Sequence, residues 1–243
     1  YKRQRVLVYD RTSSTNDVAA EYARNPDNDG LVVFAEQQTA GRGRTGAPWY
    51  SSHGDSLLFS TVLIDCSVKA ELLPLTCAVA VADALGRVGD HQGKIKWPND
   101  VLLDGRKVGG ILVEAKQNAA HLTRVIGIGI NCHQTAETLP ADLRDSATSL
   151  DLVAGGRCHR PTLARRVLTS LDHWLIAAER SGREVTDAWS RLSTQLGQRV
   201  TLFYDGKRFS GNCVGVDPQN GLILQLDRGG VRMFHAAHTT CLL

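Results

Sequence analysis

Glycines and arginines alternate in residues 38–46, which read QTAGRGRTG. The segment holds no large apolar side chain, so it cannot contribute to a hydrophobic core. Glycine-rich backbone can expose N–H groups to an anion, and Arg42 and Arg44 add fork-shaped cationic donors. The Lys-Ser/Thr ending of a P-loop is missing, which excludes that kind of nucleotide site. These residues alone leave three interpretations open: a solvated loop, an Arg-Gly tract that binds nucleic acid, or an anion site.

A second group of chemically useful residues lies at 96–100, which read KWPND. Pro98 separates two strand-like stretches, and because proline cannot donate to a sheet ladder we expect a bend there. Such a bend can direct the Lys96 ammonium into a cleft, where a point cation suits a phosphate or a carboxylate. At about 4 Å and an effective dielectric of about 20, one such contact has a Coulomb energy of roughly 4 kcal/mol before desolvation. The alternative is an exposed lysine on an edge strand.

Small and polar residues at two further places could complete a binding site. Ser14, Thr15 and Asn16 stand at an expected helix start, where hydroxyl groups usually cap the helix but can also hold a polar head group. Gly127 and Gly129 lie in an apolar strand, where glycines let a flat ligand approach the backbone. A Rossmann fingerprint is excluded there, because that motif needs three glycines between a strand and a helix.

The helices and strands that must position these residues can be predicted from the spacing of apolar residues and from turn signals. The expected strands cover residues 6–9, 31–35, 56–64, 94–115 and 122–131, and the expected helices begin near residue 14 or cover residues 72–88, 161–182 and 187–192. The Asp104-Gly105 pair predicts a hairpin, so the middle of the chain should be an antiparallel meander. Ser14 and Asp17 have the spacing of a capping box, and Gly182 is the expected C-cap of the third helix.

Short strands and glycine-containing turns crowd the end of the chain. The expected strands are 199–204, 208–216, 221–226 and 231–236. This pattern is typical of a small β-barrel. We therefore expect two domains, residues 1–194 and residues 195–243, of which the first carries all the candidate site residues.

The composition is that of an ordinary soluble protein. The chain has 243 residues, 42% hydrophobic and 22% charged, and its net charge of +3 is too small to indicate nucleic acid by itself. No apolar run approaches the roughly 18 residues of a membrane span, so we expect a cytoplasmic protein with no membrane partner. The six cysteines are scattered, with no CxxC pair and no zinc spacing, which favours reduced thiols over a disulfide framework.

Taken in order, these motifs resemble the biotin protein ligase family. The matching segments are SSTND (13–17), AEQQTAGRGRTG (35–46), KWPNDVLLDGRKVGGILVEA (96–115), GIGINC (127–132) and ATSL (147–150). The resemblance implies a mixed α/β domain related to class II tRNA synthetases and lipoate ligases, followed by a small SH3-like barrel. It also implies synthesis of biotinyl-5′-AMP from biotin and ATP with Mg²⁺, and transfer of biotin to one lysine of a biotin carboxyl carrier domain.

The resemblance further implies a role for each candidate residue. The implied biotin site consists of Ser14, Thr15, Asn16, Gln38, Arg42, Gly43, Arg44, Lys96, Gly127 and Gly129. The implied ATP site consists of Arg42, Arg44, Trp49, Lys96, Asn99, Lys107 and Asn131. The implied catalytic groups are the cations Arg42, Arg44 and Lys96. Because the biotin carboxylate itself attacks the α-phosphate, no protein nucleophile is needed, and the cations must neutralise two anions brought together.

Three other functions stay open at this point. A lipoate or octanoate ligase would use the same fold, and a non-catalytic biotin sensor would bind biotin without releasing pyrophosphate. An RNA-binding module would use the Arg-Gly loop and bind with a steep salt dependence. Since the catalytic pattern begins near the start of the chain, we expect no DNA-binding half in it. Unpaired strand edges in the meander would allow two copies to pair as a homodimer.

Overall fold

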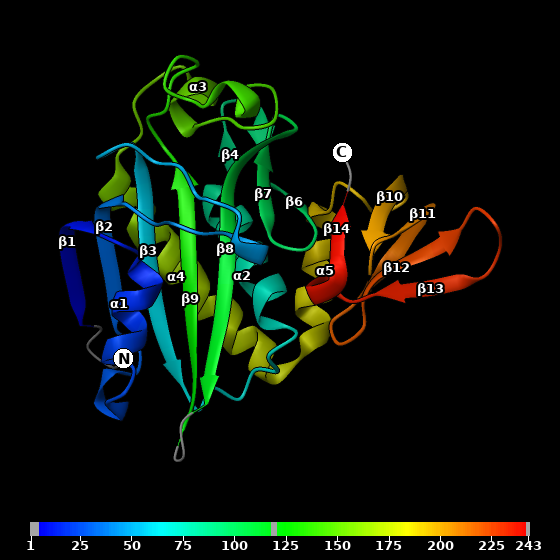
Figure 1. Cartoon of the computed structure of the whole chain (residues 1–243), viewed down its shortest axis with the longest axis horizontal. Coiled ribbons are helices and arrows are strands. Elements are labelled where there is room, and N and C mark those ends of the chain that lie inside the picture. Colours follow the sequence, from blue (N-terminus) through cyan, green and yellow to red (C-terminus); the bar gives the residue numbers. More distant parts are fainter. Residues whose placement is uncertain (1–4, 118–120, 242–243) are drawn as a thin grey trace.

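The computed structural model describes residues 5–117 and 121–241, which form a larger lobe and a smaller lobe at the C-terminal end (Figure 1). The larger lobe is built on a seven-stranded sheet. In spatial order its strands are β1 (Val6–Thr12), β2 (Val32–Gln38), β3 (Ser56–Ile64), β9 (Leu122–Asn131), β8 (Arg106–Gln117), β7 (Asp100–Leu103) and β6 (Lys94–Lys96). β1 and β2 pair in parallel and the other pairings are antiparallel, which confirms the expected meander.

The predicted hairpin joins β7 to β8. Asp104 and Gly105 have φ values of 50° and 70°, and a type I′ turn needs positive φ at both central residues. From this turn β8 pairs along β9, and the register sets Gly110 opposite Gly129. The two glycines leave a patch of bare backbone at the centre of the sheet.

Helices cover both faces of the sheet, because neighbouring residues of a strand point to opposite sides. Val32, Phe59 and Ile126 belong to the apolar cluster that includes α2 and α4, whereas Val33 and Val62 pack with α1. The helices are α1 (Thr15–Tyr22), α2 (Leu73–Leu85), α3 (Leu150–Ala154), α4 (Arg160–Arg180) and α5 (Gly182–Leu192), with short 3₁₀ turns η1 (Pro26–Asn28), η2 (Arg44–Gly46), η3 (Ala141–Leu143) and η4 (Ala236–His238). A small ribbon of β4 (Arg87–Val88) and β5 (His91–Gln92) follows α2.

The predicted start of the first helix is confirmed, but two predicted helix caps are wrong. Ser14 is the N-cap residue of α1, but its side chain makes no capping bond, and the Asp17 carboxylate binds Arg42 instead. Gly182 begins α5 rather than ending α4. Ser181 separates the two helices and is the C-cap of α4. Its backbone is extended, with a φ of −157°, whereas the expected glycine cap would be left-handed.

The smaller lobe is a five-stranded antiparallel sheet, which confirms the expected C-terminal β domain. In spatial order its strands are β13 (Val231–Phe234), β12 (Gly221–Leu226), β11 (Lys207–Asp217), β10 (Arg199–Tyr204) and β14 (Thr239–Cys241). Leu202 and Leu222 join the same buried cluster as Trp189 of α5, so one apolar core connects the lobes. Between the end of α5 and the start of β10 we propose the boundary of the domains 1–194 and 195–243. Among the described residues, no helix is both long enough and apolar enough to cross a membrane.

Candidate active site

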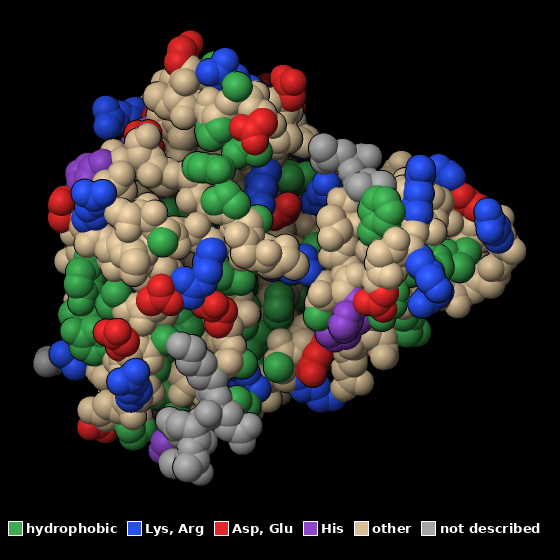
Figure 2. All heavy atoms as spheres, in the orientation of Figure 1, with side chains coloured by type: hydrophobic (Ala, Val, Ile, Leu, Met, Phe, Trp, Pro, Cys, Tyr) green, Lys and Arg blue, Asp and Glu red, His purple; other side chains and the backbone are tan. Residues whose placement is uncertain are grey.

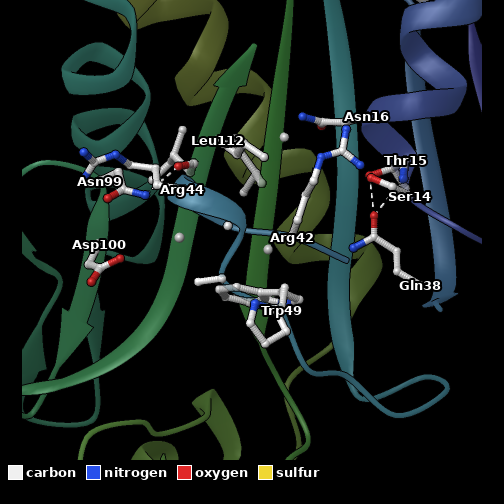
Figure 3. A pocket seen from close by; sticks show the side chains of 18 of the residues that line it. Ser14, Thr15, Asn16, Gln38, Arg42, Arg44, Trp49, Asn99, Asp100 and Leu112 are labelled. Carbon is white, nitrogen blue, oxygen red and sulfur yellow. Dashed lines mark hydrogen bonds between the residues drawn. The ribbon is translucent and has the colours of Figure 1, made fainter. Parts of the chain in front are cut away.

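A cavity of about 210 Å³ opens beside the N-terminal end of α1 (Figure 3). Most residues expected to bind a ligand line this first cavity. They are Ser14, Thr15, Asn16, Gln38, Arg42, Gly43, Arg44, Trp49, Asn99, Lys107, Gly127 and Gly129. The basic loop, the start of α1 and the bare centre of the sheet therefore meet in one place.

A second cavity, of about 500 Å³, adjoins the first. Both are lined by Trp49, Asp100 and Lys107. The second cavity is also lined by Lys96 and Asn131, which do not line the first. All the predicted site residues thus surround two adjoining spaces. Figure 2 shows Lys and Arg side chains in the crease between the lobes on this face.

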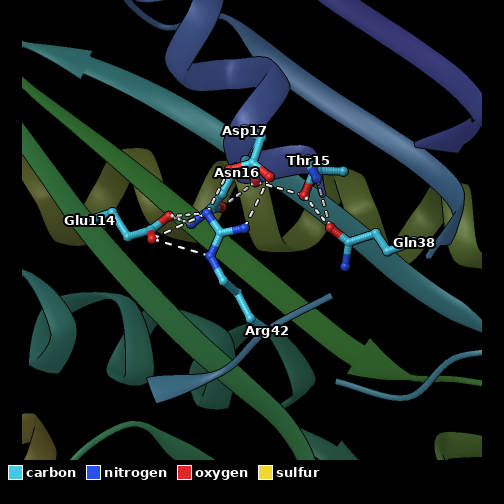
Figure 4. Close-up of polar contacts among 7 residues, drawn as sticks. Thr15, Asn16, Asp17, Gln38, Arg42 and Glu114 are labelled. Carbon is cyan, nitrogen blue, oxygen red and sulfur yellow. Dashed lines mark hydrogen bonds and ion pairs between the residues drawn. The ribbon is translucent and has the colours of Figure 1, made fainter. Parts of the chain in front are cut away.

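A buried hydrogen-bond network closes one end of the first cavity (Figure 4). Gln38 Oε1 accepts from the Thr15 amide at 2.7 Å and from the Thr15 hydroxyl at 3.0 Å. Ser60, which is fully buried, lies behind it, with its hydroxyl 2.6 Å from Asn16 Oδ1 and 2.7 Å from Thr15 Oγ1. One hydroxyl hydrogen can serve a single acceptor at a time, so these groups retain capacity for a polar ligand.

Arg42 lies between two carboxylates at the edge of this network (Figure 4). Its guanidinium donates to both oxygens of Asp17, at 2.7 and 3.0 Å, and to Glu114 at 3.2 Å. The hydrogen bonds to Asp17, together with the nearby Glu114 charge, raise the pKa of Arg42 above its ordinary value. Since its charge is already compensated, Arg42 must exchange partners before it can hold an anionic substrate.

Arg44 is directed the other way, toward the smaller lobe. Figure 3 shows it on the side of Asn99, whereas Arg42 points toward Asn16. The Arg44 guanidinium donates to the carbonyl of Ala236 in η4 and reaches that of Thr239 at 3.5 Å. Burial lowers the pKa of Arg44, although an arginine stays charged at any ordinary pH. The second arginine of the loop therefore connects the cavity to the C-terminal sheet.

The loop folds back on itself instead of extending into solvent. Gly43 donates to the Ala47 carbonyl at 2.6 Å, and Trp49 donates to the Gly41 carbonyl at 2.9 Å. Thr45 has a φ of 55°, which makes the turn between these bonds. The segment is therefore a closed turn that forms one wall of the cavities, while Thr39, Ala40, Thr45 and Gly46 stay exposed to solvent.

Trp49 covers the glycine patch of the sheet. A β-carbon on Gly129 would lie 2.6 Å from Cε2 of the indole, and one on Gly110 would lie 3.1 Å from Cζ3. Gly127 is approached in the same way by Asn16, whose Oδ1 would lie 2.3 Å from a β-carbon. The Trp49 indole N–H is buried and finds no acceptor among the described residues. Buried donors of this kind are normally satisfied, so this one points to a ligand acceptor or to movement of the ring.

The cations near the junction of the cavities differ in their surroundings. Lys107 Nζ lies 2.6 Å from Asp100 Oδ1 and 5.6 Å from the centroid of the Trp49 ring. Lys96 makes no ion pair or side-chain hydrogen bond with the described residues. It lines the second cavity but not the first. Lys107 therefore reaches both cavities, and Lys96 offers an unpaired charge in one of them.

The side chains of Asn99 and Asn131 each donate a hydrogen bond to a backbone carbonyl. Asn99 Nδ2 donates to the Ile111 carbonyl at 2.8 Å, beside the bulge between β7 and β8. Asn131 Nδ2 donates to the Thr148 carbonyl at 2.9 Å. Asn131 Oδ1 already accepts from Gln134 Nε2 at 3.3 Å, so Asn131 contributes mainly to the shape of the wall, whereas Asn99 can offer its side-chain oxygen to a ligand.

Sequence reasoning missed four residues of the site. They are Asp17, Ser60, Asp100 and Glu114. Asp17 and Asp100 end the SSTND and KWPND motifs, and Glu114 is a lone carboxylate in the apolar strand β8. A charge at such a position signals a buried partner. Ser60 carries no such signal, because a serine in a strand is common.

The chain is similar in sequence to known proteins. Residues 8–131 match the model of the biotin/lipoate A/B protein ligase family. The chain is 32% identical to the bifunctional ligase/repressor BirA of Bacillus subtilis, over 96% of this chain and 73% of that protein. It is 33% identical to the biotin–[acetyl-CoA-carboxylase] ligase of Mycobacterium tuberculosis, over 92% of this chain and 83% of that one.

A solved structure agrees over the whole chain. The biotin protein ligase of Aquifex aeolicus, in complex with biotin and ATP, is 26% identical to this chain with a TM-score of 0.83. The alignment covers 100% of this chain and 99% of that one. The larger lobe and the small C-terminal sheet thus have the fold of a known group, and the chain belongs to the biotin protein ligase family.

Proposed function

We propose that this chain activates biotin with ATP to biotinyl-5′-AMP and then transfers biotin to one lysine of a biotin carboxyl carrier domain. The observation that carries the proposal is the position of the Lys107 ammonium, between a cavity with a polar, hydrogen-bonded end and a larger second cavity. The names of the relatives, biotin–[acetyl-CoA-carboxylase] ligases among them, support the choice of biotin and carrier.

The polar end of the first cavity suits the ureido ring of biotin. A ureido group offers two N–H donors and one carbonyl acceptor. Ser14, Thr15 and Asn16 are almost fully buried there and present hydroxyl and amide groups in a confined space. Gly127 and Gly129 carry no side chain, so a flat bicyclic ring would lie against β9 once Asn16 and Trp49, which cover the two glycines here, move aside.

The junction of the cavities suits the reacting atoms. Attack of the biotin carboxylate on the α-phosphate brings two anions together and expels pyrophosphate, so the main requirement is positive charge in a fixed geometry. Lys107 reaches both cavities and is best placed to contact both reacting groups. Lys96, on the nucleotide side, would then hold phosphate oxygens, with Arg42 joining after it leaves its carboxylate partners.

The basic turn and Trp49 would protect the product. A mixed anhydride hydrolyses if water reaches it, so the loop that carries Arg42 and Arg44 must stay over the adenylate. The contact of Arg44 with the Ala236 carbonyl supports this role, because it ties the turn to the smaller lobe. Trp49, close to both cavities, would cover the adenine.

The described residues fit a magnesium ion that arrives with ATP. Asp100 lines both cavities and offers a hard carboxylate oxygen, the ligand type that Mg²⁺ prefers, and phosphates and water can supply the rest. Bound there, the ion would neutralise phosphate charge. Asp100 would hold it in exchange for its ion pair with Lys107, which would free Lys107 for the substrates.

Three finer features complete the proposal. The C-terminal five-stranded sheet is the SH3-like barrel of the family. Two copies pair as a homodimer through a sheet edge. β1 lies at one edge of the seven-stranded sheet, whereas at the other edge Thr194 already donates to the Ile95 carbonyl of β6. The six free cysteines support a cytoplasmic location. Sedimentation with and without biotin and ATP tests the dimer.

Transfer to a carrier tests the proposal as a whole. The protein is incubated with ATP, MgCl₂, biotin and a purified carrier domain, and the intact mass of the carrier is measured. We expect the mass of one biotin to be added, and none on a carrier whose acceptor lysine is replaced by arginine. Lipoate in place of biotin should leave the carrier unmodified. An unmodified carrier with biotin, or modification with lipoate alone, would refute the assignment.

A further inference from the structure

Three potential metal ligands converge where β9 ends, although the sequence separates them. The ligand atoms of His133, Asp151 and Cys158 all lie within 4.8 Å of one another. Within residues 5–117 and 121–241, this is the one group of three or more His, Cys, Asp or Glu side chains with that geometry. The spacing of the cysteines along the chain gave no sign of it, because the cluster combines three residue types from separate segments.

The surrounding backbone holds these side chains in place. The Asp151 amide donates to the Cys132 carbonyl at 3.0 Å, and the His133 amide donates to the Asp55 carbonyl at 2.8 Å. The Cys158 amide donates to one oxygen of Asp151 at 2.7 Å, while the other oxygen lies 2.7 Å from His133 Nδ1. The ligand atoms are therefore positioned by contacts that do not involve the Cys158 sulfur.

We propose that His133, Asp151 and Cys158 bind a divalent cation of the zinc class. Imidazole nitrogen and thiolate sulfur favour such an ion over Mg²⁺ or Ca²⁺, and His, Cys and Asp are the ligand types of protein zinc sites. Binding releases the thiol proton of Cys158, so one thiolate and one carboxylate balance the two positive charges of the ion. Arg160, a cation that interacts electrostatically with Cys158, is paired with Glu36 at 2.8 Å.

Cys132 is a candidate for a fourth ligand, although it is not part of the cluster whose ligand atoms lie within 4.8 Å of one another. This residue is buried, and its sulfur interacts with that of Cys158. A tetrahedral zinc ion accepts either a second sulfur or a water at this point. The site as proposed needs three protein ligands, and Cys132 or water completes it.

The position of the cluster relative to the second cavity indicates what the ion would do. His133 and Asp151 flank residues 134–150, and Leu139, Ser146 and Ala147 of this segment line the second cavity. An ion that joins the two ends would restrain this wall. Because the ion binds the folded chain and not the unfolded one, it would also raise the melting temperature.

Metal titration of the full chain tests the proposal. Protein stripped with a chelator and kept reduced with a phosphine is dialysed against ZnCl₂ or CoCl₂, and the bound metal is counted by elemental analysis. We expect one equivalent, an absorption band from cobalt bound to thiolate, and a higher melting temperature with Zn²⁺. Cys158→Ser should weaken Zn²⁺ binding at least about tenfold. It should also abolish the thiolate band if water is the fourth ligand, or reduce the band if Cys132 is.

Matched variants separate this site from adventitious binding. Cys66→Ser removes a half-buried thiol outside the cluster and should bind Zn²⁺ as the parent does. His133→Gln should bind more weakly. If that variant fails to fold, Cys158→Ser still decides, because the backbone contacts of Cys158 do not need its sulfur. The absence of saturable binding, or equal affinity in Cys158→Ser and the parent, would overturn the proposal.

Discussion

The indole of Trp49 lies on the backbone of Gly129, with no room for a β-carbon between them. Gly110, opposite Gly129 in the register of β8 and β9, allows the same close approach. Trp49 ends the turn that carries Arg42 and Arg44. The glycines of the sheet therefore set how deep the basic turn can sit over the cavities.

Gly129→Ala should displace this ring. The new methyl group would collide with the indole, and relief of such overpacking typically costs about 1–3 kcal/mol of folding free energy. We expect a lower midpoint of denaturant unfolding, a change in tryptophan fluorescence and weaker binding of ATP in calorimetry. Gly156→Ala is the control, since a β-carbon there meets nothing within 4 Å. Equal ATP affinity in Gly129→Ala and the parent would show that the ring position does not matter.

Glu114→Gln should strengthen nucleotide binding. The substitution keeps an acceptor for Asn16 but removes one of the two charges that hold Arg42. Arg42 then leaves its partners at lower cost, and we expect the Kd for ATP to fall by roughly threefold to tenfold, on the order of 1 kcal/mol for a charge-assisted hydrogen bond. Glu36→Gln breaks a comparable pair, with Arg160, outside both cavities and should not change this Kd. Unchanged or weaker binding in Glu114→Gln would contradict the exchange of partners.

Lys107→Ala and Lys96→Ala should differ in size and kind. We expect Lys107→Ala to lower the rate of pyrophosphate release by roughly 10²–10³, because it removes the cation at the junction. Lys96→Ala should have a smaller effect, mainly on the KM for ATP. Lys69→Ala, at an exposed position away from the cavities, is the control. Both active-site variants should have melting temperatures close to that of the parent. A larger loss of rate in Lys96→Ala than in Lys107→Ala would contradict the roles assigned to the two lysines.

Arg44→Gly should let the adenylate escape faster. The substitution removes the bonds from the turn to Ala236 and Thr239. We expect the dissociation rate of biotinyl-5′-AMP to rise about tenfold, the factor that corresponds to about 1.4 kcal/mol. Arg183→Ala, at a side chain that is 88% exposed, should leave the rate unchanged. A rate in Arg44→Gly equal to that of the parent would show that the tether has no such role.

Local patterns predicted most of the fold, because each depends on nearby residues. The strand 56–64 and the strand 122–131 lie where the apolar runs place them, and the Asp104-Gly105 turn has the expected positive φ values. The failures lie at helix ends. Asp17 prefers a guanidinium that is distant in sequence to a local cap, and no local pattern can show that competition.

The site was predictable where the motifs themselves hold the ligand-facing groups. The polar helix start, the glycine strand and the basic loop converge as the resemblance implied. Sequence alone could not separate the environments of Lys96 and Lys107, because these depend on how the β6–β7–β8 meander is registered against the loop. Nor could it show that Arg42 is already ion-paired, since one partner, Glu114, lies on a strand far along the chain.

The central claim, that the two cavities assemble biotinyl-5′-AMP, is tested most directly by native mass spectrometry of the protein after incubation with biotin, ATP and MgCl₂ in the absence of any carrier. We predict a complex heavier than the free protein by the mass of biotinyl-5′-AMP, and its loss in Lys107→Ala. A complex containing only unreacted biotin, or no bound product, would contradict it.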